Sequence, residues 1–186
     1  ASGNTFTLNA SSYTTGLNIT GGAGNDIIAG STGNDTITGN GGTDTMTGNA
    51  GTNKFIIDNS DIANITDLKG ADVLQISAGA TANATVTETF TATSATSNSG
   101  TATLSDSGAF AINLSAATGS TGFTVDASAA TTAVVISGSS HNDILIGGSG
   151  NDTFTGNGGI DSMTGNGGTN TFIINNNGTA NISDLK

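Results

Sequence analysis

Large apolar side chains are rare in this sequence, and in two stretches they return once every nine residues. The apolar position is occupied by Ile28, Ile37, Met46 and Phe55 in the first stretch, and by Leu145, Phe154, Met163 and Phe172 in the second. A single apolar residue between two outward-facing neighbours predicts a short strand that buries its middle side chain. The intervening residues are rich in glycine, asparagine and aspartate, which predicts a turn before each strand.

A longer repeat contains both stretches. Residues 21–69 align without a gap to residues 138–186, at an offset of 117, and are about two-thirds identical to them. The same offset matches residues 3–20 to residues 120–137. Repetition of a whole composite unit is typical of solenoids and repeat arrays. We therefore expect a 117-residue tandem repeat, cut from a longer array.

A second regular position carries the chemistry of the nine-residue unit. Two residues before each apolar position stands an acid or its amide: Asp26, Asp35, Asp44 and Asn53 in the first block, and Asp143, Asp152, Asp161 and Asn170 in the second. Units such as GSTGNDTIT and GGSGNDTFT resemble the GGxGxDxUx nonapeptides of the repeats-in-toxin (RTX) family. The resemblance implies an all-β fold, namely calcium-binding blocks of parallel β-roll or β-solenoid.

Calcium explains why the acids recur with this spacing. If two nonapeptides complete one coil, residues eighteen apart stack, and Asp26 lies over Asp44 as Asp143 lies over Asp161. A hard dication between stacked carboxylates, with turn carbonyls as further ligands, converts their repulsion into a bridge. We predict Ca²⁺ ligands at all eight positions, and capping ligands at Asp67 and Asp184. The alternative is a run of Asx turns with solvated acids.

Some residues depart from the pattern. His141 stands where the motif has glycine, and we interpret it as a surface histidine in a relaxed turn. The first block also carries Asp58 and Asp61, whose counterparts in the second block are Asn175 and Gly178. Any site formed by these two acids is therefore not shared between the blocks.

Five segments follow from these patterns. We expect a β lead-in coil at 1–20, a first RTX block at 21–75, a Thr/Ser/Ala-rich β module at 76–117, a second lead-in coil at 118–137 and a second RTX block at 138–186. Threonine-rich alternation in residues 84–93, and two apolar runs around Ser107 and Gly108, predict strands in the module. The module is either a small sandwich or a set of further solenoid coils.

Composition narrows the possible functions. The formal net charge is −11, with three lysines and no arginine, which argues against a nucleic-acid partner. The chain has no cysteine and one histidine, so a metal must bind to oxygen ligands. No apolar run is long enough for membrane insertion. No nucleophile, base and orienting acid recur together, and we do not expect an enzyme.

We expect a calcium-stabilised structural repeat of a secreted bacterial cell-surface protein. Its Thr/Ser/Ala/Gly-rich composition resembles surface-layer proteins, with self-association between identical chains or adjacent repeats. The alternatives are a calcium-rigidified stalk of a large RTX adhesin, or the C-terminal RTX secretion region of an exported enzyme or toxin. The 117-residue recurrence favours either array over a secretion region, because such a region does not need to repeat a composite unit.

Overall fold

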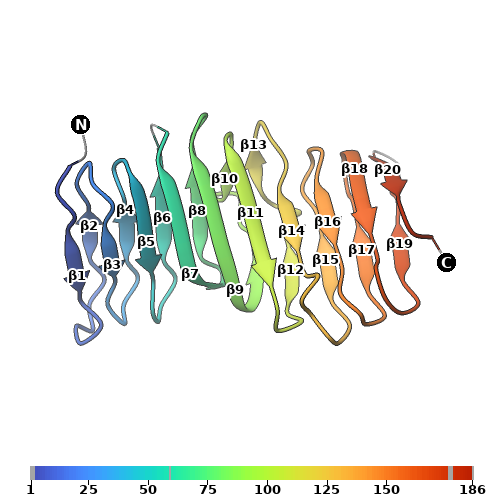
Figure 1. Cartoon of the computed structure of the whole chain (residues 1–186), viewed down its shortest axis with the longest axis horizontal. Coiled ribbons are helices and arrows are strands. Elements are labelled where there is room, and N and C mark those ends of the chain that lie inside the picture. The colour runs from blue at the N-terminus through green and yellow to red at the C-terminus, as the bar shows by residue number, and fades with distance from the viewer. Residues whose placement is uncertain (1–2, 59, 176–177, 186) are drawn as a thin grey trace.

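The computed structural model describes residues 3–58, 60–175 and 178–185, and winds them into one elongated β-solenoid (Figure 1). The described residues are built from strands and turns, and their strands pair in parallel. Figure 1 shows strands of a front layer and of a back layer following each other along most of the chain as it advances from the N-terminus to the C-terminus. This confirms the predicted all-β, parallel solenoid.

The front layer is the main path of a 14-stranded sheet. In spatial order its strands are β1 (Thr7–Asn9), β3 (Ile27–Ala29), β5 (Thr43–Thr47), β7 (Ile62–Gly70), β9 (Thr81–Thr91), β11 (Thr101–Asp106), β14 (Thr124–Asp126), β16 (Ile144–Ile146), β18 (Gly159–Thr164) and β20 (Gly178–Ile182).

The back layer has two parts. A six-stranded sheet contains β2 (Asn18–Thr20), β4 (Thr36–Thr38), β6 (Lys54–Ile57), β8 (Val73–Ile76), β10 (Ser97–Asn98) and β13 (Thr118–Gly119). Toward the C-terminus it is continued by β12 (Ala111–Asn113), β15 (Val135–Ser137), β17 (Thr153–Thr155) and β19 (Thr171–Ile173). The end of the long β9 pairs with β12, so this part of the back layer belongs to the 14-stranded sheet.

The strand registers set the length of each coil. Within the two blocks, paired residues lie eighteen apart, as in Ile28 with Met46 and Phe154 with Phe172. Two nonapeptides therefore form one coil, as predicted. At the end of the first block the spacing becomes nineteen, as in Phe55 with Leu74.

Residues 76–117 form further coils of the same solenoid. β9 pairs in parallel with β7 on one side and with β11 on the other, at a spacing of eighteen to twenty residues. This decides between the two predicted folds for the segment and excludes a separate sandwich. Six of its alanines and Phe90 join the hydrophobic cluster that runs through both blocks, so the core is continuous.

Position eight of the nonapeptide faces inward in both blocks. Ile28, Ile37, Met46, Phe55, Leu145, Phe154 and Met163 are fully buried, and Phe172 is half-buried. The rings of Phe154 and Phe172 stack with centroids 5.1 Å apart, which links adjacent coils. No helix among the described residues is long and apolar enough to cross a bilayer.

Candidate metal sites

The position-six acids lie inside the solenoid, directly before the strands. Asp26 and Asp143 are each 1% exposed and Asp44 is fully buried. The Asp26 backbone N–H donates to Oδ1 of Asp44 at 2.7 Å, and the Asp143 N–H donates to Oδ1 of Asp161 at 2.9 Å. The predicted stacking of these pairs is therefore present, with each carboxylate bonded to the backbone of the preceding coil.

The second column of position six lies on the other layer, and its last nonapeptide residue is asparagine; in the first block the Asn53 N–H donates in turn to Oδ1 of Asp72 at 2.7 Å. The Asp35 N–H donates to Oδ1 of Asn53 at 3.0 Å, and the Asp152 N–H donates to Oδ1 of Asn170 at 2.8 Å. The amide of Asn170 also donates to the Gly167 carbonyl oxygen at 3.0 Å. Asparagine thus keeps the bond between coils while removing one negative charge from the column.

In four of the position-six acids, the second carboxylate oxygen closes the turn in which it lies: Asp26, Asp35, Asp143 and Asp152. Oδ2 of Asp35 accepts the Ser31 N–H at 2.7 Å, and Oδ2 of Asp152 accepts the Gly148 N–H at 2.9 Å. Next to Asp143 the space is narrow, since a Cβ on Gly138 would lie 2.5 Å from Asp143 Oδ2 and 2.8 Å from the Gly156 carbonyl oxygen. A glycine here lets a carboxylate oxygen and a carbonyl of the next coil approach each other.

No basic side chain in the described part of the chain neutralises these buried acids. Among the described residues, an ion pair joins Lys69 to Asp67 at 3.1 Å, and both residues lie outside the position-six columns. Burial raises the pKa of Asp143 to about 6, although the Phe123 and Ser139 N–H groups oppose the shift. Burial likewise raises the pKa of Asp44 and Asp161. Ionised carboxylates inside a solenoid need a cation to compensate their desolvation.

The donor set fits a hard divalent cation. The available ligands are carboxylate, amide and carbonyl oxygens, and Oδ2 of Asp44 is buried without a hydrogen-bond partner. The described residues bring no three acidic or histidine side chains around one point. Turn carbonyls or water would therefore supply most ligands of an ion held by one or two aspartates, as in a flexible calcium site.

Asp67 and Asp184 occupy a different position from the other predicted ligands. The two oxygens of Asp67 accept the N–H groups of Gly48 and Asn49, both at 2.7 Å. In the second block, the two carboxylate oxygens of Asp184 accept the N–H groups of Gly165 and Asn166 in the same way. Each acid therefore caps a turn of the preceding coil, and its role as a metal ligand stays a prediction.

Sequence reasoning missed a second ladder in the turns, formed by the asparagine directly before the acid. Oδ1 of this asparagine accepts the N–H of the residue eighteen positions later, at 2.8–2.9 Å, in four cases: Asn25, Asn34, Asn142 and Asn151. The repeated Asn-Asp dipeptide was the available signal. Both asparagine and aspartate thus hold adjacent coils in register.

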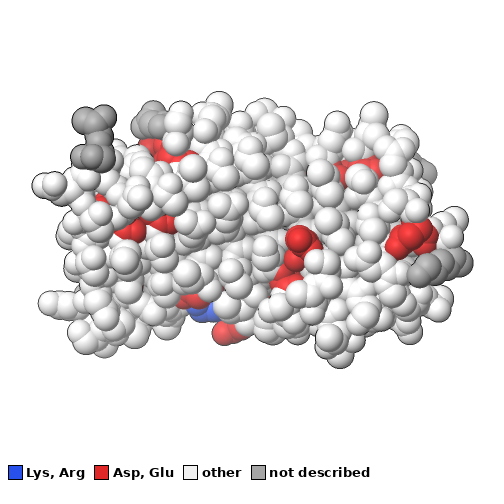
Figure 2. Space-filling model, viewed as in Figure 1, with Lys and Arg blue, Asp and Glu red and all other residues white. Residues whose placement is uncertain are grey.

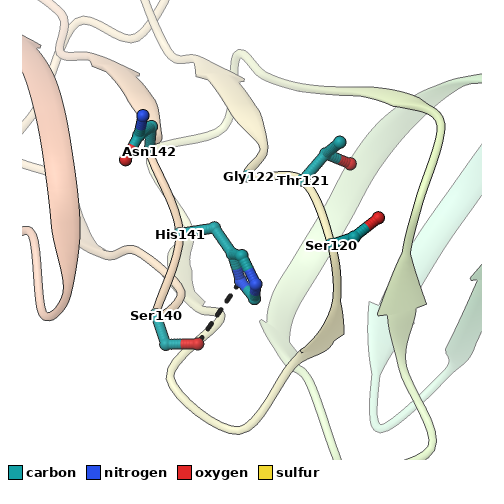
Figure 3. Close-up of a pocket in the computed structure, with 6 residues that line it drawn as sticks. All are labelled: Ser120, Thr121, Gly122, Ser140, His141 and Asn142. Atoms are coloured by element: carbon teal, nitrogen blue, oxygen red, sulfur yellow. Dashed lines mark hydrogen bonds between the residues drawn. The ribbon is translucent and has the colours of Figure 1, made fainter.

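Figure 3 shows the pocket around His141, between two neighbouring turns. The imidazole extends toward Ser120 and Thr121, and the Ser140 hydroxyl lies 3.3 Å from its Nδ1. The rest of the pocket lining has no acidic residue and consists of Ser120, Thr121, Gly122, Ser140 and Asn142.

The acids on the displayed molecular face form small separate patches (Figure 2).

Comparison with known protein families supports the metal interpretation. Residues 20–55 and 137–172 match the RTX calcium-binding nonapeptide repeat, in four copies. No curated protein and no solved structure matches the chain significantly. The matched stretches contain all eight position-six residues, whereas Asp67 and Asp184 lie outside them.

Proposed function

We propose, from the RTX calcium-binding nonapeptide repeats in both blocks, that this chain is a calcium-stabilised structural repeat of a secreted bacterial cell-surface protein. Its role is mechanical. Calcium neutralises the buried acids, and the neutralised coils stack into a rigid rod. Extracellular calcium modules work at about 10⁻⁴ to 10⁻³ M, so the chain would fold after export.

We propose further that the parent protein builds a surface-layer array. The observation that carries this is the recurrence of a 117-residue unit within one continuous solenoid, whose core passes through the segment between the blocks. Equivalent surfaces then recur along the rod. Ile27 and Ile144 occupy equivalent positions on β3 and β16, and they are 53% and 47% exposed. Apolar side chains repeated on one sheet favour lateral self-association.

The second candidate is the stalk of a large RTX adhesin. The elongated shape in Figure 1 favours it, because a continuous solenoid makes a stiff spacer. Electron microscopy of source cells, with antibody labelling against this chain, separates the two. A periodic sheet that carries the label supports the surface layer, and isolated labelled fibres support the stalk. Label confined to the culture medium would overturn both and favour the secretion region of an exported enzyme or toxin.

A further inference from the structure

The exit from the first block contains buried acids that do not belong to any nonapeptide. β6 ends at Ile57 and β7 begins at Ile62, and the Asp61 N–H donates to the Asp58 carbonyl oxygen at 3.0 Å in the turn between them. Asp61 is fully buried, and its carbonyl oxygen accepts the Thr81 N–H at 2.8 Å. The RTX match ends at residue 55, before this turn.

Buried carboxylate oxygens lie here without hydrogen-bond partners. Among the described residues, the unpartnered buried side-chain atoms are both carboxylate oxygens of Asp61, Oδ2 of Asp44 and Oδ1 of Asp58. Asp44 and Asp61 meet at Gly39, where a Cβ would lie 2.7 Å from Asp61 Oδ2 and would clash with Asp44 Oδ2. Glycine therefore leaves open the space into which both carboxylates point.

The electrostatics of this pair call for a positive charge. The next lysine after this turn in the sequence is Lys69. Its Nζ donates to the carbonyl oxygen and to the carboxylate of Asp67. Two buried carboxylates that face each other repel unless a shared proton or a cation joins them, and a cation leaves both of them ionised.

We propose a divalent-cation site that closes the first block, with Asp44 and Asp61 as its two charged ligands. Calcium is the ion that suits a flexible oxygen site, and this assignment rests on the proposed function. The site differs from the repeat sites because Asp61 is seventeen residues from Asp44 and lies in the connection to β7. An ion bound between Asp44 and Asp61 links the last nonapeptide coil to the first coil outside the RTX repeats.

The second block is a natural comparison for this site. Asp161 corresponds to Asp44, but Gly178 replaces Asp61 and Asn175 replaces Asp58. Gly178 pairs with Gly159 in the register of β18 with β20, so no carboxylate faces Asp161 from that position. We therefore expect the first block to bind one more ion than the second.

Native mass spectrometry of the full chain in millimolar CaCl₂ tests the site. We expect Asp61→Asn to bind one calcium ion fewer than the wild type. The matched control Asp126→Asn should keep the wild-type count, because Asp126 lies on β14, outside the proposed sites, and only accepts the Ser128 N–H. Equal counts for the wild type and Asp61→Asn would overturn this site and leave the repeat sites standing. A wild type that binds no calcium would overturn the proposed function as well.

A second measurement separates metal binding from a purely structural role of Asp61. The calcium concentration at the folding midpoint, followed by circular dichroism, should rise for Asp61→Asn because one bound ion no longer stabilises the folded chain. At saturating calcium, Asp61→Asn should reach the β signal of the wild type, since the repeat sites still hold their ions. A lower β signal at saturating calcium would show that Asp61 acts through packing and would contradict the proposal.

Discussion

Replacing Gly42 by alanine tests whether the turns stack at the spacing described. Gly42 precedes β5, and its φ of 103° is one that side chains rarely adopt. A Cβ there would lie 2.5 Å from the Gly24 carbonyl oxygen and 2.8 Å from its carbonyl carbon. These are backbone atoms of the adjacent coil, so they cannot move aside without separating the two turns.

The expected destabilisation has two parts. A non-glycine residue at positive φ costs roughly 1–2 kcal/mol, and forced overpacking adds about 1–3 kcal/mol. Gly70→Ala is the matched control, because its φ is also positive, at 55°, but a Cβ there has no neighbour within 4 Å. Gly42→Ala should therefore lower the free energy of unfolding by about 1–3 kcal/mol more than Gly70→Ala.

Urea unfolding of both variants, at one saturating calcium concentration and followed by circular dichroism at 215 nm, measures the difference. We expect the midpoint of Gly42→Ala to fall clearly below that of Gly70→Ala, with similar slopes. Equal midpoints would show that the turns containing Gly24 and Gly42 are not in contact, and would refute the eighteen-residue stacking in solution.

Three further predictions concern the core, one buried acid and the turn ladder. Phe154→Ala should destabilise the folded chain by about 3–5 kcal/mol in urea titrations, because it leaves a cavity and removes the ring stack with Phe172; no change would contradict the continuous core. Burial raises the pKa of Asp106 in the folded chain, so protonation of Asp106 stabilises the folded state. This contribution to the free energy of unfolding is lost as pH rises through the raised pKa. At fixed calcium, the melting temperature of the wild type relative to Asp106→Asn should therefore fall as pH rises above the ordinary aspartate pKa value of 3.8, and a rise would contradict the assigned burial. Asn34→Ala should cost about 1 kcal/mol in the same urea titration, because the Thr52 N–H loses its acceptor, and no change would contradict the ladder. Thr32→Ala is the comparison in the same turn, because it removes an exposed hydroxyl bond to the Tyr13 carbonyl oxygen and leaves the asparagine ladder intact.

The repeat blocks could be predicted from the sequence because two local signals coincide in every nonapeptide. An apolar residue such as Phe154 marks each strand, and an acid such as Asp152 marks the turn two residues earlier. Their common period of nine, together with the resemblance to RTX nonapeptides, predicts a coil of eighteen residues before any long-range contact is known. The strands at Thr124–Asp126 and Val135–Ser137 also follow from the lead-in pattern around residues 123–137.

The segment between the blocks could not be resolved in the same way. Alternating threonine and small residues in β9 are compatible with a sandwich or a solenoid, since both bury one face of a strand. Its place depends on parallel pairing with β7 and β11, whose partners lie eighteen to twenty residues away without a constant period. The contact between Asp44 and Asp61 could not be predicted from the nine-residue period either. The coil at the block exit is longer than eighteen residues, so the period no longer gives the pairing there.

Circular dichroism and limited proteolysis of the same sample, first stripped of metal at neutral pH and then titrated with calcium, test the central claim most directly. The buried acids lack a basic partner in the described structure, so the stripped chain should show little β signal and be cleaved rapidly. Millimolar calcium should restore the β signal and protease resistance together. A metal-stripped chain as folded and as resistant as the calcium-loaded one would contradict the account.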